Sequence, residues 1–367
     1  MKATAILAMA LAGAMTAQAP VTLKDAFHGS FLIGAALNAA IFTGEDAGDA
    51  ALVKAQFDSI SPENDLKWER IHPTPDGYNF GPADGYVAFG EKNHMFIVGH
   101  TLVWHNQTPG WVFRDDKGNF VDRETLLGRM RDHIHTVVGR YKGRIGSWDV
   151  VNEALDENGA LRQSLWLKII GPDFIAKAFQ FAHEADPAAM LTYNDYSLEN
   201  EAKRNGAIEL IRGLRAQGVP VTAVGLQGHD TLAWPTAEAE DTTIAAFARL
   251  GLKVAISELD INVLPAATRN QTADVALSVQ ARAELNPYAS GLPDSVQEAL
   301  ATRYASLFGV FLKHRDAVFR VTFWGVTDGD SWLNNWPVKG RTSYPLLFGR
   351  GGQPKPAFDA VVRAAVR

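Results

Sequence analysis

Two similar stretches organise this chain: residues 147–153 read SWDVVNE, and residues 253–260 read KVAISELD. Each is a strand-like apolar run that ends in polar residues, and each carries one glutamate, Glu153 or Glu258. A carboxylate at the end of a buried strand is costly to desolvate, so we expect it to be paired, hydrogen-bonded or catalytic. Either glutamate alone could be a helix cap or part of a structural ion pair. Their shared context favours a functional pair.

The same pattern, an apolar run followed by polar and aromatic residues, recurs along the whole chain. It predicts eight buried strands, near residues 31–37, 57–61, 95–99, 147–153, 190–193, 221–226, 253–257 and 318–323. Most of these runs are continuously apolar, which is typical of parallel strands that are covered on both faces. We therefore expect an α/β protein with a parallel sheet.

Amphipathic helices are predicted between most of these strands. In the clearest one, apolar residues fall at three- and four-residue steps from Leu126 to Tyr141, and Asp122 is available as the N-cap. Other helices are expected around residues 174–182, 203–217, 244–248, 296–311 and 357–366.

The position of the polar residues chooses between two parallel folds. They follow the carboxyl ends of strands two to eight, which is where a (β/α)8 barrel has its active site. An open doubly wound sheet would concentrate them at one switch point. The sequence therefore predicts a single-domain (β/α)8 TIM barrel over residues 20–367, and no linker or repeat indicates a second module.

Composition narrows the class of partner. The net charge is -6, with 35 Lys and Arg against 41 Asp and Glu and no basic block, so we expect no nucleic acid and no membrane as partner. An uncharged substrate fits better. The chain has no cysteine, which excludes disulfides, thiolate metal ligands and a cysteine nucleophile.

Residues 1–19 have the features of a secretory signal peptide. Lys2 gives a short positive region, residues 6–15 are apolar, and Ala17-Gln18-Ala19 is a typical cleavage site. The apolar run is half the roughly 20 residues that a membrane span needs. We expect cleavage near Ala19 and a secreted or periplasmic mature protein.

The glutamate pair suits the hydrolysis of a glycosidic bond. Hydrolysis with retention requires one protonated carboxyl as acid/base and one ionised carboxylate as nucleophile. Their environments should differ, because the acid needs a raised pKa and the nucleophile needs hydrogen bonds that keep it charged. Asn152 beside Glu153 can meet a sugar hydroxyl, while His229 and Asp260 can form a hydrogen-bonded trio with Glu258.

Six motifs at consecutive strand ends, in unbroken order between about Phe31 and Phe358, resemble family 10 glycoside hydrolases, the endo-β-1,4-xylanases. These motifs are Glu63-Asn64-x-x-Lys67-Trp68, Gly99-His100-Thr101-Leu102-Val103-Trp104-His105, Trp148-Asp149-Val150-Val151-Asn152-Glu153, Gln227-Gly228-His229, Ser257-Glu258-Leu259-Asp260 and Phe323-Trp324-Gly325.

The resemblance implies a retaining endo-β-1,4-xylanase in which Glu153 is the acid/base and Glu258 the nucleophile. It implies xylan and xylo-oligosaccharides as partners and neither cofactor nor metal, and we expect a monomer. Tyr196 matches an aglycone-side sugar platform, followed by Ser197 where many relatives have asparagine. The other substrate-binding residues that it implies are Glu63, Asn64, Lys67, His100, Trp104, Gln107, Asn152, Gln227, His229, Trp324 and Trp332.

Two alternatives keep the barrel but change its function. A retaining β-glycanase of the same fold could cut glucan, although Lys67 and Trp332 should crowd a C6 hydroxymethyl group and favour a pentose. A non-catalytic sugar-binding barrel is the second alternative, and the presence of both Glu153 and Glu258 disfavours it.

A metal site is the remaining alternative. His100, His105 and His229 are possible ligands, but a catalytic zinc site typically takes three convergent ligands, and the polar neighbours here suit carbohydrate. The long stretch 262–293 could bind a cation through Asp274, although an ordinary loop is the simpler interpretation.

Overall fold

The computed structural model describes residues 21–268 and 272–365. Their strands form one parallel sheet in the order β6-β5-β4-β3-β2-β1-β9-β8-β7, and a further pairing of β6 with β8 closes it into a barrel of eight strands. The predicted (β/α)8 barrel is confirmed. The strands are β1 (Leu32–Leu37), β2 (Ser59–Pro62), β3 (Phe96–Val103), β4 (Ser147–Asn152), β5 (Met190–Asp195), β6 (Ala223–Leu226), β7 (His229–Thr231), β8 (Lys253–Asn262) and β9 (Val318–Phe323).

All eight predicted strands are present, and the short strand β7 was not predicted. Gly228 separates it from β6 with a φ of +75°, a left-handed conformation that glycine adopts without strain. After this turn the chain pairs again with the carboxyl half of β8, in a register that sets His229 opposite Asp260. The turn therefore places a histidine beside the end of the strand that carries Glu258.

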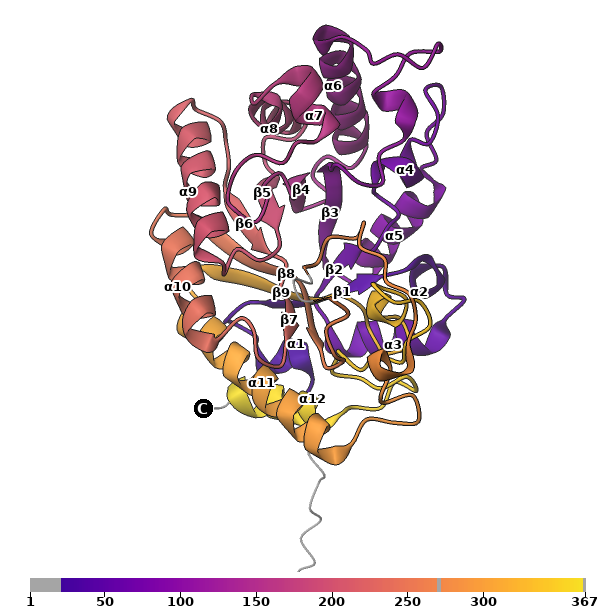
Figure 1. Cartoon of the computed structure of the whole chain (residues 1–367), viewed down its shortest axis with the longest axis vertical. Helices are drawn as coiled ribbons and strands as arrows, with labels where there is room; N and C mark the ends of the chain where they lie inside the picture. The colour runs from indigo at the N-terminus through magenta and orange to yellow at the C-terminus, as the bar shows by residue number, and fades with distance from the viewer. Residues whose placement is uncertain (1–20, 269–271, 366–367) are drawn as a thin grey trace, which may run out of the picture.

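Helices surround the barrel (Figure 1). The predicted N-cap of α6 is present, because the Asp122 side chain accepts a hydrogen bond from the Thr125 amide. The helices are α1 (Leu23–Ala26), α2 (Ala39–Thr43), α3 (Ala47–Gln56), α4 (Trp68–Ile71), α5 (Gly81–Lys92), α6 (Arg123–Arg140), α7 (Leu165–Ile170), α8 (Phe174–Ala185), α9 (Glu201–Ala216), α10 (Ala237–Ala248), α11 (Asp294–Lys313) and α12 (Pro356–Ala365), with 3-10 turns η1 (Gly110–Val112), η2 (Ala283–Leu285) and η3 (Trp332–Asn334).

Two substantial helices, α3 and α5, were not predicted. α5 contains glycines that weaken a helical pattern in sequence, but Gly90 has a packing role. A Cβ at this position would lie 2.6 Å from the Ile97 side chain and 2.9 Å from that of Ile60. The glycine therefore lets α5 approach strands β2 and β3 closely.

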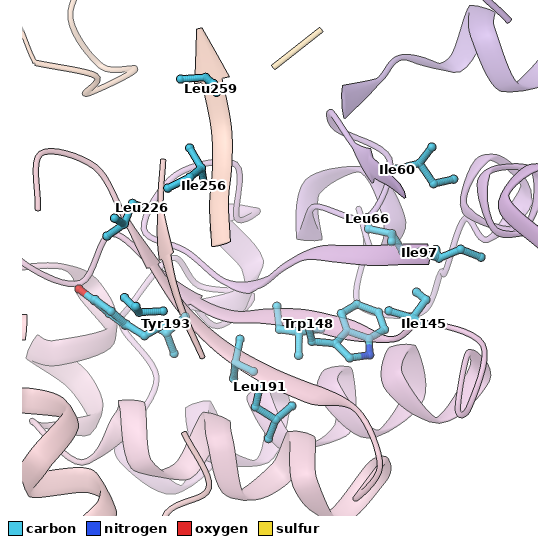
Figure 2. Close-up of a cluster of buried hydrophobic side chains, with 14 of the residues drawn as sticks. Ile60, Leu66, Ile97, Ile145, Trp148, Leu191, Tyr193, Leu226, Ile256 and Leu259 are labelled. Carbon is cyan, nitrogen blue, oxygen red and sulfur yellow. The ribbon is translucent and has the colours of Figure 1, made fainter. Parts of the chain in front are cut away.

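One large hydrophobic core links the strands to the helices. Figure 2 shows part of it, where side chains of successive strands pack together. Gly99 on β3 is essential to this packing, because a Cβ there would lie 2.2 Å from the ring of the fully buried Trp148. The labelled members of the cluster are Ile60, Leu66, Ile97, Ile145, Trp148, Leu191, Tyr193, Leu226, Ile256 and Leu259.

In the part of the chain that the structure describes, no helix combines the length and apolarity needed to cross a membrane. The predicted signal peptide, residues 1–19, lies outside the described residues, as do the last two residues of the chain.

Candidate active site

The carboxyl ends of the strands enclose a cleft of about 560 Å³. Its lining comprises most of the residues predicted for the site and two residues of the loop after β8, Ala273 and Val275. The predicted residues in the lining are Glu63, Asn64, Lys67, His100, Trp104, Gln107, Asn152, Glu153, Gln227, His229, Glu258, Trp324 and Trp332. Asp260 lines an adjoining pocket, and Tyr196 lines neither.

Glu153 directly follows β4 and is 3% exposed. Its carboxyl group accepts hydrogen bonds from Trp104 Nε1 at 2.9 Å, Gln227 Nε2 at 3.0 Å and Asn152 Nδ2 at 3.3 Å. Burial raises its pKa, and the charge of Asp195 raises it further, so that the pKa reaches about 7 although the Gln227 and Trp104 hydrogen bonds lower it. Below neutral pH this carboxyl can therefore donate a proton.

Glu258 lies on β8 and is 5% exposed. It accepts a hydrogen bond from Asn194 Nδ2 at 2.7 Å, and its other oxygen lies 3.3 Å from His229 Nε2. Burial alone would raise the pKa of Glu258, but the His229 hydrogen bond, the charges of His100 and His229 and the Asn194 hydrogen bond lower it to about 2. This carboxylate is ionised at any ordinary pH.

His229 is held between two carboxylates. Its Nδ1 lies 3.1 Å from Asp260 Oδ1, and the second Asp260 oxygen accepts from Trp332 Nε1 at 2.6 Å. Burial lowers the pKa of His229, but Asp260 and Glu258 together raise it to about 10. The imidazole is therefore a cation with both N–H groups donating. The trio expected from the sequence is brought together.

An amide that was not among the predicted site residues connects Glu258 to Asn152, which itself donates to Glu153. The side-chain nitrogen of Asn194, on β5, donates both to Asn152 Oδ1 at 2.9 Å and to Glu258 Oε1 at 2.7 Å, while its oxygen accepts from Ser257 Oγ at 2.6 Å. Gly225 makes room for this amide, because a Cβ there would lie 2.1 Å from Asn194 Oδ1. In the sequence, the only indication of a role for Asn194 was its position at the end of a strand.

The cleft lining also carries a buried lysine, Lys67. Its ammonium nitrogen lies 3.2 Å from Asn64 Oδ1 and 5.0 Å from the centre of the Trp104 ring. Burial lowers the pKa of Lys67, although nearby carboxylates oppose the shift. Gln107 Nε2 donates to the same Asn64 oxygen at 3.4 Å, so this part of the lining presents several fixed polar groups.

Aromatic rings complete the cleft. Trp332 is stacked on Trp336 with 4.4 Å between ring centres, and the His229 ring lies 4.8 Å from Trp332. Trp324 meets the ring of His100 edge to face at 5.3 Å. Aromatic rings among fixed polar groups can contact both the apolar faces and the hydroxyl groups of a sugar.

Tyr196, the predicted aglycone platform, does not reach the cleft in this structure. It is only 3% exposed, its hydroxyl accepts from Arg162 Nη2 at 2.7 Å, and the Lys203 ammonium lies 3.5 Å from its ring centre. Lys203 also pairs with Asp195 at 3.0 Å, although both side chains are fully buried. Arg162 and Lys203 were not predicted, because neither comes directly after a strand: Arg162 lies ten residues beyond β4, and Lys203 lies on α9.

The histidines considered as metal ligands have other partners. His100 Nδ1 lies 3.0 Å from Asp149, and His105 Nε2 lies 3.0 Å from the Asn106 amide. Within residues 21–268 and 272–365, no group of three or more His, Cys, Asp or Glu side chains could hold a metal ion. Asp274, considered as a cation ligand, lies 3.5 Å from Arg162 Nη1 instead.

A parallel barrel whose strand ends carry one carboxyl of raised pKa and one of lowered pKa, among sugar-sized aromatic faces, has the features of a glycoside hydrolase. The model of a protein family described as "Glycosyl hydrolase family 10" matches residues 22–364. The chain therefore belongs to glycosyl hydrolase family 10, as the resemblance predicted.

Named relatives agree with this membership. The chain is 44% identical over 355 residues to endo-1,4-beta-xylanase A of Xylanibacter ruminicola, covering 97% of this chain and 96% of the relative. It is 44% identical to a beta-1,4-xylanase of Dictyoglomus thermophilum, covering 93% and 90%. Among solved structures, a GH10 endoxylanase from a sugarcane soil metagenome has a TM-score of 0.89 at 44% identity, covering 94% of this chain and 99% of the other.

Proposed function

We infer that this chain is a retaining endo-1,4-β-xylanase that hydrolyses internal β-1,4-xylosidic bonds of xylan. The observation that carries this inference is the opposite tuning of two buried carboxyl groups, with a pKa of about 7 for Glu153 and about 2 for Glu258. Family membership and the xylanase names of relatives of similar length support the substrate class.

The reaction takes two displacements. Ionised Glu258 attacks the anomeric carbon while Glu153 gives its proton to the departing glycosidic oxygen, which leaves a covalent glycosyl-enzyme. Glu153, now ionised, then removes a proton from a water that attacks the same carbon and releases Glu258. His229, charged and hydrogen-bonded to both Asp260 and Glu258, keeps the nucleophile ionised and oriented.

The remaining lining residues are proposed to bind the sugars. Lys67 and Trp332 are proposed to lie near the innermost glycone-side sugars, where they would crowd a C6 hydroxymethyl group. This favours xylose, which lacks C6, over glucose. Other groups proposed to contact sugar are Glu63, Asn64, His100, Trp104, Gln107, Asn152, Gln227 and Trp324.

Export and assembly remain part of the proposal. The sequence features of residues 1–19 support secretion or periplasmic targeting after cleavage near Ala19. We propose that the mature enzyme acts as a monomer on xylan and xylo-oligosaccharides. The amino-terminal sequence of the exported protein and its mass in solution test these two points.

Product profiles test the proposed function. Linear xylan should give a ladder of xylo-oligosaccharides from the first minutes, while cellulose gives little soluble sugar and a chelator changes nothing. An aryl β-xylobioside should exceed the aryl β-cellobioside in kcat/KM by at least about tenfold, the lower end of what a small steric difference yields. Trp332→Ala should lower both values and narrow this ratio. A wild type that prefers the cellobioside would favour the glucanase alternative.

A further inference from the structure

A short segment of the loop after β8 separates the catalytic cleft from a second pocket. Ala273 and Val275 line the cleft, while Thr272 and Ala273 line the adjoining pocket of about 740 Å³. The two pockets also share His229 and Trp332, so they are neighbours in one groove. Residues 272–275 therefore lie between its two halves.

The side chain in the middle of this segment reaches the other side of the barrel mouth. Asp274 Oδ2 lies 3.5 Å from Arg162 Nη1, and Arg162 follows β4, whereas Asp274 follows β8. Arg162 is itself fixed, because its Nε donates to the Glu153 carbonyl at 3.1 Å and its Nη2 to the Tyr196 hydroxyl at 2.7 Å. The ion pair thus links a loop from the nucleophile strand to the residues around the acid.

The position of Arg162 identifies which end of the groove is affected. In the proposed reaction Glu153 protonates the departing oxygen, so the leaving-group sugars lie on the Glu153 side. Arg162 donates to the backbone carbonyl of Glu153 and to the Tyr196 hydroxyl, whereas Lys67 and Asn64 are proposed to contact the glycone-side sugars. The pair between Asp274 and Arg162 is therefore at the leaving-group end.

We propose that Asp274 determines specificity for chain length: its ion pair with Arg162 holds residues 272–275 across the leaving-group end of the groove. A substrate with several sugars beyond the scissile bond must displace this segment, whereas a substrate with a single small leaving group does not. The inference rests on the proposed xylanase function.

Loss of the ion pair should have a small effect on kcat/KM, and one substitution can remove its charge without disturbing the local turn. The side chains of Asp274 and Arg162 are 32% and 16% exposed, and partly exposed pairs of this kind change an equilibrium by about two- to fivefold. Asp274 Oδ1 also accepts from the Ala276 amide at 2.9 Å, which fixes the local turn. Asp274→Asn retains an acceptor for this turn and removes only the charge.

The test compares kcat/KM for xylohexaose with that for an aryl β-xylobioside, on the full-length enzyme. Asp274→Asn should raise the ratio of the first to the second by about two- to fivefold, mainly through the hexaose. Glu284→Gln is the matched control, because Glu284 lies on the same loop and its pair with Arg282 has the same 3.5 Å distance, but both side chains are more than half exposed. This control should leave the ratio unchanged.

Salt gives a second readout that a merely structural role would not produce. Raising NaCl from about 0.02 M to about 0.5 M screens the pair, so the wild-type ratio should rise while the Asp274→Asn ratio stays constant. An unchanged or lowered ratio in Asp274→Asn, with the aryl xylobioside still cleaved, overturns the inference. A failure of the proposed xylanase function would give a different result, because neither xylohexaose nor the aryl β-xylobioside would then be cleaved.

Discussion

Glu153, directly after β4, and Glu258, on β8, are buried glutamates of the same cleft, yet the two carboxyl groups have opposite properties. Glu153 and Glu258 are 3% and 5% exposed, so burial raises the pKa of both. The pKa of Glu153 nevertheless reaches about 7, while that of Glu258 falls to about 2. Equal burial therefore does not decide the protonation state.

The difference comes from the charge of the neighbours. Glu153 accepts hydrogen bonds from the neutral side chains of Trp104 and Gln227, and the charge of Asp195 opposes its ionisation. Glu258 instead faces His229, a cation that Asp260 keeps protonated. A positively charged partner lowers the pKa of a carboxyl group by more than burial raises it, whereas neutral hydrogen-bond donors only reduce the rise in pKa that burial causes.

Removing the ionised member should have the largest effect. Glu258→Ala should lower kcat on xylan by more than about 10⁴-fold, because no other group can form the covalent intermediate. Circular dichroism should show an unchanged fold. Added azide should restore turnover and yield the inverted α-glycosyl azide. Near wild-type activity of this variant would disprove the assignment of the nucleophile.

The effect of removing Glu153, the protonated carboxyl group, should depend on the leaving group of the substrate. Glu153→Ala should reduce xylan hydrolysis by about 10²–10⁴-fold, the usual contribution of a general acid. An activated aryl xylobioside, whose leaving group needs little protonation, should still react in a burst followed by slow turnover. Equal losses on both substrates without a burst would argue against Glu153 as the acid.

Replacing the cation beside Glu258 should shift the acid side of the pH profile. Activity requires ionised Glu258 and protonated Glu153, so kcat/KM should fall above about pH 7 and persist far into acid. His229→Asn removes the positive charge, so the pKa of Glu258 should rise and the acid limb should move up by at least about one pH unit. The alkaline limb, set by Glu153, should stay in place. A shift of the alkaline limb alone would contradict this account.

The smallest predicted effect is on stability, with opposite signs for the two glutamates. The pKa of Glu153 is about 4.5 in the unfolded chain and about 7 in the folded protein. The folded state therefore loses stability as the pH rises from about 4.5 through about 7. Glu153→Gln cannot ionise, so it should melt roughly 2–5 °C above wild type at pH 8 and near it at pH 5.

Glu258 should behave in the reverse sense. Its lowered pKa contributes stability above about pH 4.5 that is lost as pH falls through about 2. Glu258→Gln should therefore melt below wild type at both pH 5 and pH 8. Thermal melts of Glu153→Gln and Glu258→Gln in the same buffers test this prediction. Changes in melting temperature of the same sign at pH 8 would contradict the opposite pKa shifts of the two glutamates.

Much of this molecule was predictable from local sequence. The strand runs, the N-cap Asp122 and the polar residues after each strand gave the barrel and most of the cleft. The failures have local causes. Glycines weakened the pattern of α5, although Gly90 exists for close packing, and β7 contains too few residues for a period to be recognised.

Other features depend on contacts between segments that are far apart in the sequence. Asn194 connects Glu258, through Asn152, to Glu153 only because β5 lies beside β4 and Gly225 leaves space for its amide. Arg162 and Asp274 are 112 residues apart and have no common motif. Spacing along the chain contains no information about such contacts.

The sequence by itself determined the parallel barrel, the two glutamates and the family, because strand periodicity and short motifs are local properties. Only the tertiary structure showed which neighbours give the two glutamates opposite pKa shifts, that Tyr196 is buried, and that residues of the segment 272–275 line both pockets. The physical reason is that a pKa and an exposed fraction are sums over all neighbours within a few ångströms, and folding brings most of those neighbours from remote parts of the chain.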